Sequence, residues 1–456
     1  MRPARALALA SLAALLVPSA CGAHTPTDYY VRQGSPCSGT YPRCGVDEPE
    51  REFADVDQCA ALLRPGDTCW LKDGVYAKGI DESSGRAYQP RRSGTREQPI
   101  AYRAYPGQRP VFRGPAIWTM GHKGRLSYIH YDGLRVEGVL RIVGESEDDR
   151  TRGVVVENCE LVGGGGKDDG NWSALFVQWA EDLVVRNNAI RFERPAKSGR
   201  GQKGISVFNG RRTRIEDNRI EGFPSEAIFD KEGGEQNAYR RNWFERNRIQ
   251  IKLSNQPDER GIYNVGTEIS GNLFRCDPDA DGLAVLVLSQ ATDWRVFQNT
   301  GIGCNAIQVR SSSGPASGGQ VYNNLWWRPG PGGEWWASEH GDDREPAFMD
   351  HNLYTPGGRF RENRDTAQER DYDTLAAWAS VPHPARYDAH SLETEPWFRD
   401  FAAGDFRPVP ESKARGAGRG GEDLGAWPYE ASPAPGPKPV AERAQPPRKV
   451  AAQGSR

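Results

Sequence analysis

The sequence predicts an all-β protein, a right-handed parallel β-helix with a short capping helix at its N-terminal end. The first observation is a repeated phrase in which an Asn is followed two residues later by an apolar residue. Its Asn occupies positions 188, 218, 242, 272, 299 and 324, so the spacings are 30, 24, 30, 27 and 25 residues. Repeats of this length with strand-like composition indicate a solenoid. In such folds, stacked turn Asn side chains hydrogen-bond from coil to coil. Cys159 occupies the Asn slot of an earlier copy, where we expect a buried free thiol.

The second observation is an alternating apolar phrase between successive Asn positions, as in ALFVQ (174–178) and AIQVR (306–310). Alternation with a period of two indicates strands with one buried face. We expect two inward stacks: Leu175, Ile205, Ile228, Ile249, Val285 and Ile307, and then Val177, Val207, Asp230, Ile251, Val287 and Val309. The matching outward column is predicted to hold Gln178, Phe208, Lys231, Lys252, Leu288 and Arg310. Asp230 is the only carboxylate in these inward stacks, and a buried carboxylate needs polar partners.

The ends of the repeat carry helical patterns. Residues 53–63 place Phe53, Val56, Ala60 and Leu63 at helical spacing, which fits a cap over the open end of a solenoid. A short helix is predicted over 373–379 with Asp373 as its N-cap. We therefore expect one β-helix domain over 29–429 and a disordered Pro/Ala-rich tail over 430–456.

The N-terminus predicts export. Arg2 and Arg5 precede an apolar run and then small residues, so residues 1–20 are interpreted as a signal peptide. A lipoprotein with lipid on Cys21 and ordinary cleavage near Ala23 are both open, which places the protein in the periplasm, at the cell surface or outside the cell. Eight Cys fit an oxidising compartment; Cys37/Cys44 and Cys59/Cys69 are close pairs, and Cys276/Cys304 fall on adjacent coils.

Composition excludes several classes of function. Lys and Arg total 59 against 61 Asp and Glu, so the net charge is −2 and no global basic field for nucleic acid exists. After the first twenty residues no apolar run reaches membrane-spanning length. Serine-hydrolase, Walker and dinucleotide motifs are absent from the sequence. We expect a monomer.

The opening of the predicted β-helix contains three notable stretches, LRPGDTCWLKDGVY (63–76), QPIAYRAYPGQRPVFRG (98–114) and YIHYDGLRVEG (128–138). Its end contains the closing run DAHSLETEPWF, GDFRPVP and DLGAWPY (388–429). These stretches resemble exported right-handed parallel β-helix proteins, and the opening resembles polysaccharide lyase family six, the alginate lyases and chondroitinase B-like enzymes. That family carries a Glu-x-Glu-x4-Lys motif in which the acids bind calcium and the Lys is the base, with an Arg on the next coil. Here Glu226 and Lys231 match, Pro224 replaces the first Glu, and Lys252 falls at the Arg position.

The outward lysines can also be interpreted without the family. Two ammonium groups on neighbouring strands, about 4.8 Å apart, lower the pKa of at least one of them. A lysine closer to neutrality can take the C5 proton of a uronate, while the other neutralises the sugar carboxylate. Lys231 and Lys252 are therefore the predicted catalytic residues, and Lys203, Arg200 and Arg310 the predicted substrate-binding residues for an acidic polysaccharide.

Calcium is the predicted cofactor, with two candidate sites. One is Glu226, by resemblance; the other is the run CDPDADG, with Asp277, Asp279 and Asp281 at the spacing of the first half of a calcium loop. A plain Asp-rich turn is the alternative there.

Other functions remain open at this point. The outward lysines can be ordinary solvated side chains, with Glu226 pairing across coils. In that case the alternative function is a non-catalytic glycan-binding or adhesion protein that has the same β-helix fold. A C5 epimerase shares the lyase chemistry. A glycoside hydrolase needs clustered carboxylates, and the outward columns supply little beyond Glu226.

Overall fold

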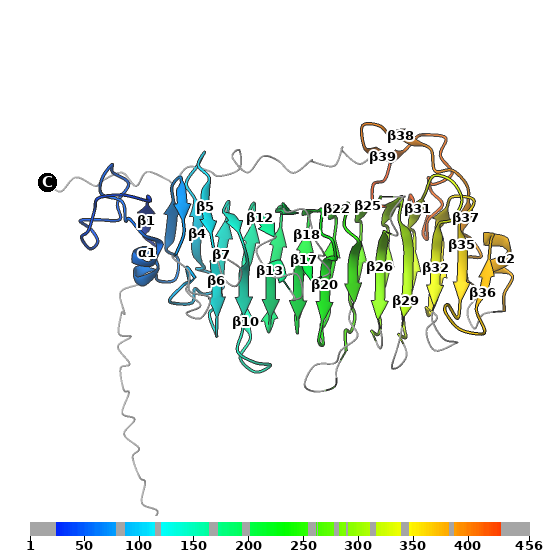
Figure 1. Ribbon diagram of the computed structural model, residues 1–456, viewed down its shortest axis with the longest axis horizontal. Coiled ribbons are helices and arrows are strands. Elements are labelled where there is room, and N and C mark those ends of the chain that lie inside the picture. The colour runs from blue at the N-terminus through cyan, green and yellow to red at the C-terminus, as the bar shows by residue number, and fades with distance from the viewer. Residues whose placement is uncertain are drawn as a thin grey trace, which may run out of the picture.

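The computed structural model describes residues 24–78, 87–114, 120–163, 172–193, 201–253, 261, 263–277, 282–288, 291–310, 316–338, 346–382 and 387–429. The chain winds into a right-handed parallel β-helix, with three long sheets whose strands follow one another along the helix axis (Figure 1). The predicted fold class is confirmed. The signal peptide, Cys21 and the 430–456 tail lie outside the described residues and stay predictions.

Each coil contributes one strand to each sheet. The first sheet, sheet A, contains in order β1 (Asp28–Val31), β2 (Thr68–Leu71), β4 (Ile100–Ala104), β7 (Ile129–Asp132), β11 (Val155–Glu157), β15 (Val184–Arg186), β18 (Arg214–Glu216), β21 (Ala238–Arg240), β24 (Glu268–Ser270), β27 (Arg295–Phe297), β30 (Gln320–Tyr322) and β33 (Phe348–Asp350). Sheet B contains β3 (Gly74–Tyr76), β5 (Pro110–Arg113), β8 (Arg135–Glu137), β12 (Glu160–Gly163), β16 (Ala189–Phe192), β19 (Arg219–Glu221), β22 (Trp243–Glu245), β25 (Leu273–Arg275), β28 (Thr300–Ile302), β31 (Leu325–Trp327), β34 (Leu353–Tyr354) and β37 (Leu392–Glu393).

Sheet C carries the alternating phrases and faces the viewer in Figure 1. It contains β6 (Met120–Lys123), β9 (Leu140–Val143), β13 (Trp172–Gln178), β17 (Gln202–Phe208), β20 (Glu226–Lys231), β23 (Ile249–Leu253), β26 (Leu283–Leu288), β29 (Asn305–Arg310), β32 (Glu334–Ser338), β35 (Arg359–Glu362) and β36 (Arg370–Tyr372). Among the described strands of sheet C, β36 alone runs antiparallel to its neighbour. Two small additional sheets pair β10 (Thr151–Arg152) with β14 (Ala180–Glu181) and β38 (Phe398–Asp400) with β39 (Asp405–Pro408).

The predicted Asn ladder is present between sheets A and B. Each Asn amide nitrogen donates to the side-chain oxygen of the Asn one coil further on, at 2.9 Å from Asn188 to Asn218 and 3.1 Å from Asn242 to Asn272. The ladder continues to Asn352, one coil beyond the predicted set. Cys159 precedes it, and its backbone N–H donates to the Asn188 side chain at 2.8 Å. As expected, the Cys159 thiol is buried and free, and burial raises its pKa.

The inward stacks of sheet C differ from prediction in one coil. Register pairs Ile228 with Ile251 and Asp230 with Leu253, so Ile251 and Leu253 fill the slots that the sequence assigned to Ile249 and Ile251. Ile249 lies opposite Glu226 on the outward face. A slip of two residues preserves the alternation, so the apolar pattern alone cannot detect it.

Caps and disulfides complete the fold. Helix α1 (Val56–Leu62) covers the N-terminal end, and Asp55 and Gln58 form its capping box. Helix α2 (Leu375–Ala379) is capped by Thr374 rather than Asp373, because the Thr374 hydroxyl accepts from the Ala377 N–H at 3.1 Å. The three predicted disulfides are present: Cys37–Cys44, Cys59–Cys69 and Cys276–Cys304. No described helix has the length and apolar character needed to cross a membrane.

Candidate active site

Three neighbouring strands bring a carboxylate and several lysines together on the outward face of sheet C. Strands β17, β20 and β23 carry Lys203, Glu226 and Lys252. Lys203 and Glu226 lie in one outward row, because the register pairs Ile205 with Ile228 on the same two strands. We call Lys203, Lys231 and Lys252 the lysine cluster.

Glu226 links two members of the lysine cluster. Its carboxylate oxygens lie 3.0 Å from the Lys252 Nζ and 3.7 Å from the Lys203 Nζ. The Ser225 hydroxyl also donates to it at 2.5 Å. Burial acts to raise the pKa of Glu226, but the two ammonium groups and the hydroxyl outweigh it, and the net pKa is lowered. Glu226 is therefore held as an anion.

An aromatic ring lies at the centre of the lysine cluster. The Nζ atoms of Lys252, Lys203 and Lys231 lie 4.7, 5.5 and 6.0 Å from the centre of the Phe229 ring. Lys231 also lies 5.0 Å from the ring centre of Phe208. Aromatic faces attract cations, so these rings hold the ammonium groups close to one another without supplying counter-charge.

Lys203 has a pKa that is lowered by its surroundings. It is 4% exposed, and its Nζ donates to the Gly201 carbonyl at 3.2 Å. Burial lowers its pKa, and the charges of Lys252 and Lys231 lower it further, against the opposing effect of Glu226. Lys203, which the sequence had assigned to substrate binding, is therefore shifted toward the neutral amine.

The predicted outward column is wrong at Lys252. The register pairs Lys231 with Phe208, as expected, but pairs Lys252 with Phe229 and not with Lys231. The two predicted catalytic lysines therefore lie in adjacent columns, Lys252 in the column of Phe229 and Lys231 in the column of Phe208. The register at β23 differs by two residues from the predicted one. Lys231 and Lys252 therefore do not share a column, and the predicted spacing of one strand between their ammonium groups is wrong. Lys231 instead contacts Glu232 at 3.0 Å.

Asp230 lies directly behind this surface, inside the β-helix. It is fully buried in the inward stack, and its Oδ2 accepts from the Tyr239 hydroxyl at 2.6 Å and from the Asn237 amide at 3.1 Å. Burial raises its pKa to about 6, although these donors favour the ionised form. Asp230 supports strand β20 from inside and does not face solvent.

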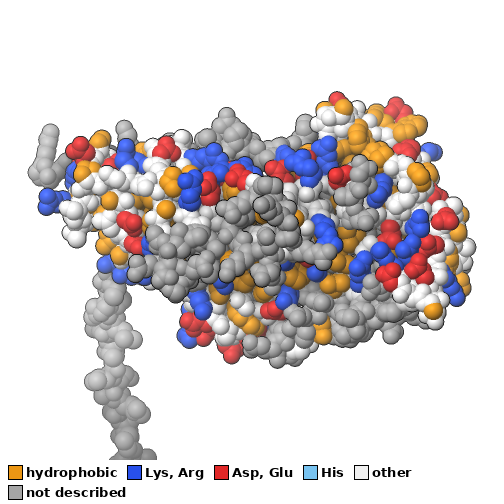
Figure 2. Space-filling view, in the orientation of Figure 1, with side chains coloured by type: hydrophobic (Ala, Val, Ile, Leu, Met, Phe, Trp, Pro, Cys, Tyr) orange, Lys and Arg blue, Asp and Glu red, His pale blue; other side chains and the backbone are white. Residues whose placement is uncertain are grey.

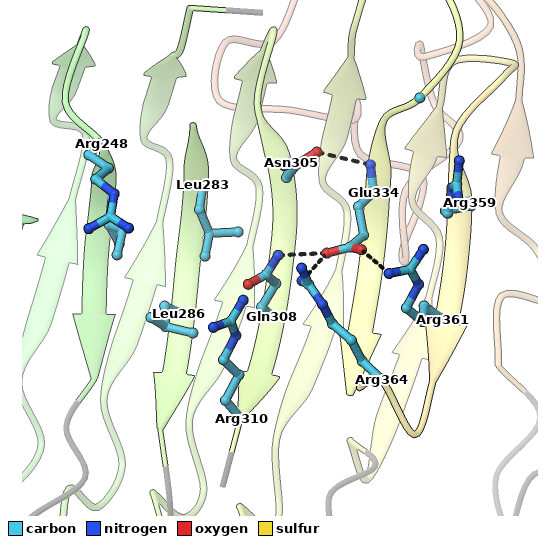
Figure 3. Close-up of a pocket in the computed structure, with 12 residues that line it drawn as sticks. Arg248, Leu283, Leu286, Asn305, Gln308, Arg310, Glu334, Arg359, Arg361 and Arg364 are labelled. Carbon is cyan, nitrogen blue, oxygen red and sulfur yellow. Dashed lines mark hydrogen bonds and ion pairs between the residues drawn. The ribbon is translucent and has the colours of Figure 1, made fainter. Parts of the chain in front are cut away.

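A second basic feature follows on the same face, toward the C-terminal end. A cavity of about 530 Å³ is lined by residues of β23, β26, β29, β32 and β35 and by residues next to these strands, and it is rich in arginine (Figure 3). We call it the arginine cavity, after Arg248, Arg310, Arg359, Arg361 and Arg364. Arg310 was predicted from the sequence. Arg359 and Arg361 were missed, although their R-F-R alternation was the signal that put both on one face of a strand.

Glu334 is the carboxylate inside the arginine cavity. It accepts from the Gln308 amide at 2.6 Å and from Arg364 at 2.9 Å, and Arg361 lies 3.8 Å away (Figure 3). Asp371 and Glu369 pair with Arg361 at 2.7 and 3.6 Å. Among the lining residues five arginines face the single carboxylate of Glu334, and Asp365 pairs with Arg364 from outside the lining at 3.6 Å. Figure 2 shows basic and acidic side chains next to one another toward the C-terminal end of this face.

The predicted calcium ligands do not come together in the described part of the chain. Glu226 is already compensated by two ammonium groups, where a metal ion would be repelled, so its surroundings do not fit calcium. Asp277 is exposed beside the disulfide-bonded Cys276. Asp279, Asp281 and the predicted substrate-binding Arg200 lie outside the described residues. Two groups with metal-ligand geometry do occur among the described residues, and neither includes a predicted ligand.

Comparison with known proteins places the fold. No protein-family model and no curated protein sequence matches the chain. Among solved structures, pectate lyase Pel9A is similar over 89% of this chain and 97% of its own, with 17% identity and a TM-score of 0.51. The chain shares the pectate lyase β-helix fold. A mannuronic acid specific polysaccharide family 6 lyase from human gut microbiota is 16% identical over 74% of this chain and 82% of its own, with a TM-score of 0.46. The surface adhesin PfbA of Streptococcus pneumoniae is 12% identical over 69% and 88%, with a TM-score of 0.44.

Proposed function

We propose that this protein is an exported polysaccharide lyase that binds a uronic-acid-containing glycan along the outward face of sheet C and cleaves it by β-elimination. The observation that carries the proposal is the lysine cluster: three ammonium groups surround Phe229, and Glu226 is the carboxylate that two of them share. A neutral glycan has no group that needs this excess of positive charge, whereas a uronate carboxylate does.

The basic surface is long enough for a polymer. One outward row runs from strand to strand through Lys252, Leu286, Gln308, Ala337 and Arg361. Four strand spacings separate the first of these from the last, or about 19 Å at 4.8 Å each. The lysine cluster and the arginine cavity therefore lie along one direction, and an acidic chain laid along the β-helix axis meets both.

The elimination uses residues already in place. A neutral lysine takes the C5 proton of the uronate, the C5–H electrons form the C4–C5 double bond, and the C4–O bond breaks. The departing sugar oxygen receives a proton from an ammonium group or from water. Charge that builds on the C6 carboxylate during the first step is stabilised by the remaining cations. Lys252 suits this second role because its ammonium is partly exposed and fixed by Glu226.

Two lysines are candidates for the base. Lys231 is the residue predicted from the sequence, and its side chain is 14% exposed, so it can contact substrate directly. Lys203 is the second candidate, because burial and neighbouring cations lower its pKa. Lys→Arg substitution separates the roles, since arginine keeps the charge but does not give up a proton in proteins.

The test is the absorbance of unsaturated uronate products. The chain lacking residues 1–20 is incubated with alginate, polygalacturonate, and chondroitin or dermatan sulfate, with calcium and with chelator. We expect product from one of these, and loss of about 10²-fold or more in kcat for the Lys→Arg variant of the base. The exposed Lys413→Met variant is the control. Chelator resistance is expected if lysine, and not calcium, neutralises the carboxylate.

Other outcomes are distinguishable. Binding of one glycan without any product, unchanged by Lys231→Arg and Lys203→Arg, would make the protein a non-catalytic binder. Altered uronate stereochemistry without new absorbance would make it an epimerase. No binding and no product across the panel would remove the support for an acidic-glycan site on sheet C.

A further inference from the structure

We propose that a divalent transition metal, with the coordination chemistry of Zn²⁺, binds between the last coils and the C-terminal cap. The ligands are Asp350, His351 and His390, whose ligand atoms all lie within 4.8 Å of one another. Asp350 ends strand β33, His351 follows in the turn, and His390 belongs to the cap segment ahead of β37. The site is separate from the lysine cluster and does not depend on the proposed lyase function.

The two oxygens of the Asp350 carboxylate have different partners. Its Oδ1 accepts the backbone N–H groups of His351 and His390, at 2.8 and 2.7 Å. Its Oδ2 lies 2.7 Å from the Nδ1 of His390 and 3.9 Å from the Nε2 of His351. The backbone donors fix the carboxylate, so Oδ2 is held toward both imidazoles.

His351 is oriented as metal-binding histidines are. Its Nδ1 lies 3.1 Å from the Ala417 carbonyl, to which only a protonated nitrogen can donate. In the neutral ring this leaves the lone pair on Nε2, the atom that faces Asp350. A backbone carbonyl that fixes the tautomer in this way is a regular partner of metal-ligating histidine. The two rings stack at 5.0 Å between centres, and their ligand nitrogens lie within 4.8 Å of each other and of the Asp350 carboxylate oxygen.

The ligand set selects the metal. Imidazole nitrogen with a carboxylate suits zinc and neighbouring first-row ions, whereas calcium prefers six or more oxygens. Ligands about 2.05 Å from a tetrahedral metal lie about 3.3 Å apart. The two measured separations, 2.7 and 3.9 Å, lie on either side of that value, and the exposed His390 side chain has room to turn its ring toward a bound ion.

The other group with metal-ligand geometry is a useful contrast. In His130, Asp132 and Glu157, both ring nitrogens of His130 are already engaged, with Arg103 at 3.2 Å and Glu157 at 2.8 Å. Arg186 also pairs with Glu157 at 2.6 Å. Guanidinium groups at this distance compete with a cation, so this group forms an ion-pair network.

Metal at Asp350, His351 and His390 would join separate chain segments. It would tie the turn after β33 to the segment that precedes β37, and through the Ala417 carbonyl to the C-terminal run over sheet B. Solenoids need their open ends closed, and here the closing segment would be secured by coordination. The expected consequence is stabilisation of the C-terminal cap by metal.

The experiment is Zn²⁺ titration calorimetry on the EDTA-treated full-length domain, with Co²⁺ absorption as a spectroscopic probe. We expect one Zn²⁺ per chain, a visible Co²⁺ band and a higher Tm with Zn²⁺. His390→Gln should weaken Zn²⁺ binding by about tenfold or more and remove the band and the Tm shift. The His390 side chain is 68% exposed, so this variant should fold, which circular dichroism checks.

His130→Gln is the matched control and should leave all three readouts unchanged. Absence of Zn²⁺ binding by the parent chain, or equal binding by His390→Gln, overturns the proposal. Loss of the signal in His130→Gln with retention in His390→Gln overturns it as well, because the metal would then occupy the other group.

Discussion

Asp230 makes the stability of the β-helix depend on pH in a predictable direction. Burial raises its pKa to about 6 in the folded chain, from the ordinary aspartate value of 3.8. Below about pH 4 the carboxyl is protonated in both states and contributes nothing. Between about pH 4 and 6 the unfolded chain ionises first, so folding stability falls, and above pH 6 the loss is complete.

The size of the effect follows from the two pKa values. A difference of about 2 units, at 1.36 kcal/mol each, gives about 3 kcal/mol. Asn at position 230 is neutral at all pH values and close in shape to the protonated acid. The free energy of unfolding of Asp230→Asn, relative to that of the parent chain, should therefore rise by about 3 kcal/mol as pH increases from about 4 to 7.5.

The assay is urea unfolding followed by tryptophan fluorescence at four pH values between 4 and 7.5. The unfolding free energy of the parent is subtracted from that of the variant at each pH. This difference removes the titrations that both proteins share, such as that of Glu157, whose pKa is lowered to about 2 by His130 and Arg186. The exposed Asp28→Asn variant shows what removal of a solvated carboxylate does. A difference between parent and Asp230→Asn that stays flat across the range would refute the reasoning.

Three further predictions concern separate parts of the molecule. Asn242→Ala removes a ladder residue that accepts from Asn218 and donates to the Ile215 carbonyl at 2.8 Å, and should cost about 3 kcal/mol or more in urea unfolding, with Arg241→Ala as a surface control. Cys304→Ala opens a disulfide that closes a 28-residue loop and should cost about 3–4 kcal/mol; a loss under 1 kcal/mol would contradict this. Arg364→Met should weaken acidic-glycan binding and flatten its salt dependence, whereas unchanged salt dependence would exclude the arginine cavity from the binding surface.

The sequence was sufficient for the fold because the determinants of the fold repeat. The Asn ladder needs one amide per coil at one position, so six matching Asn residues specified the turn, and even Cys159 was placed correctly in it. The caps were predicted nearly as well, with an error of one residue at Thr374. Each repeat supplied independent evidence for the same geometry, and errors in one coil did not affect the rest.

The site was harder to predict because it depends on single residues and on register. Alternation specifies which face a side chain occupies but is blind to a slip of two residues, and this is the error made at Lys252. The lowering of the Lys203 pKa also could not be predicted, since it arises from burial beside two other lysines and not from its neighbours in sequence. The arginine cavity combines residues from five strands, and Arg310 is the only one of its arginines that the sequence singled out.

On sheet C the residues that determine the fold and the residues that form the candidate site lie on opposite faces. Inward positions such as Ile228 and Ile251 stabilise the coil stack, and a polar residue among them, like Asp230, carries a stability cost that pH reveals. Outward positions such as Lys231 and Lys252 face solvent in part and can change without disturbing the stack. Variants of the outward lysines should therefore report on glycan binding and cleavage with little effect on unfolding. A loss of activity in them that followed a loss of stability would mean that this division is wrong.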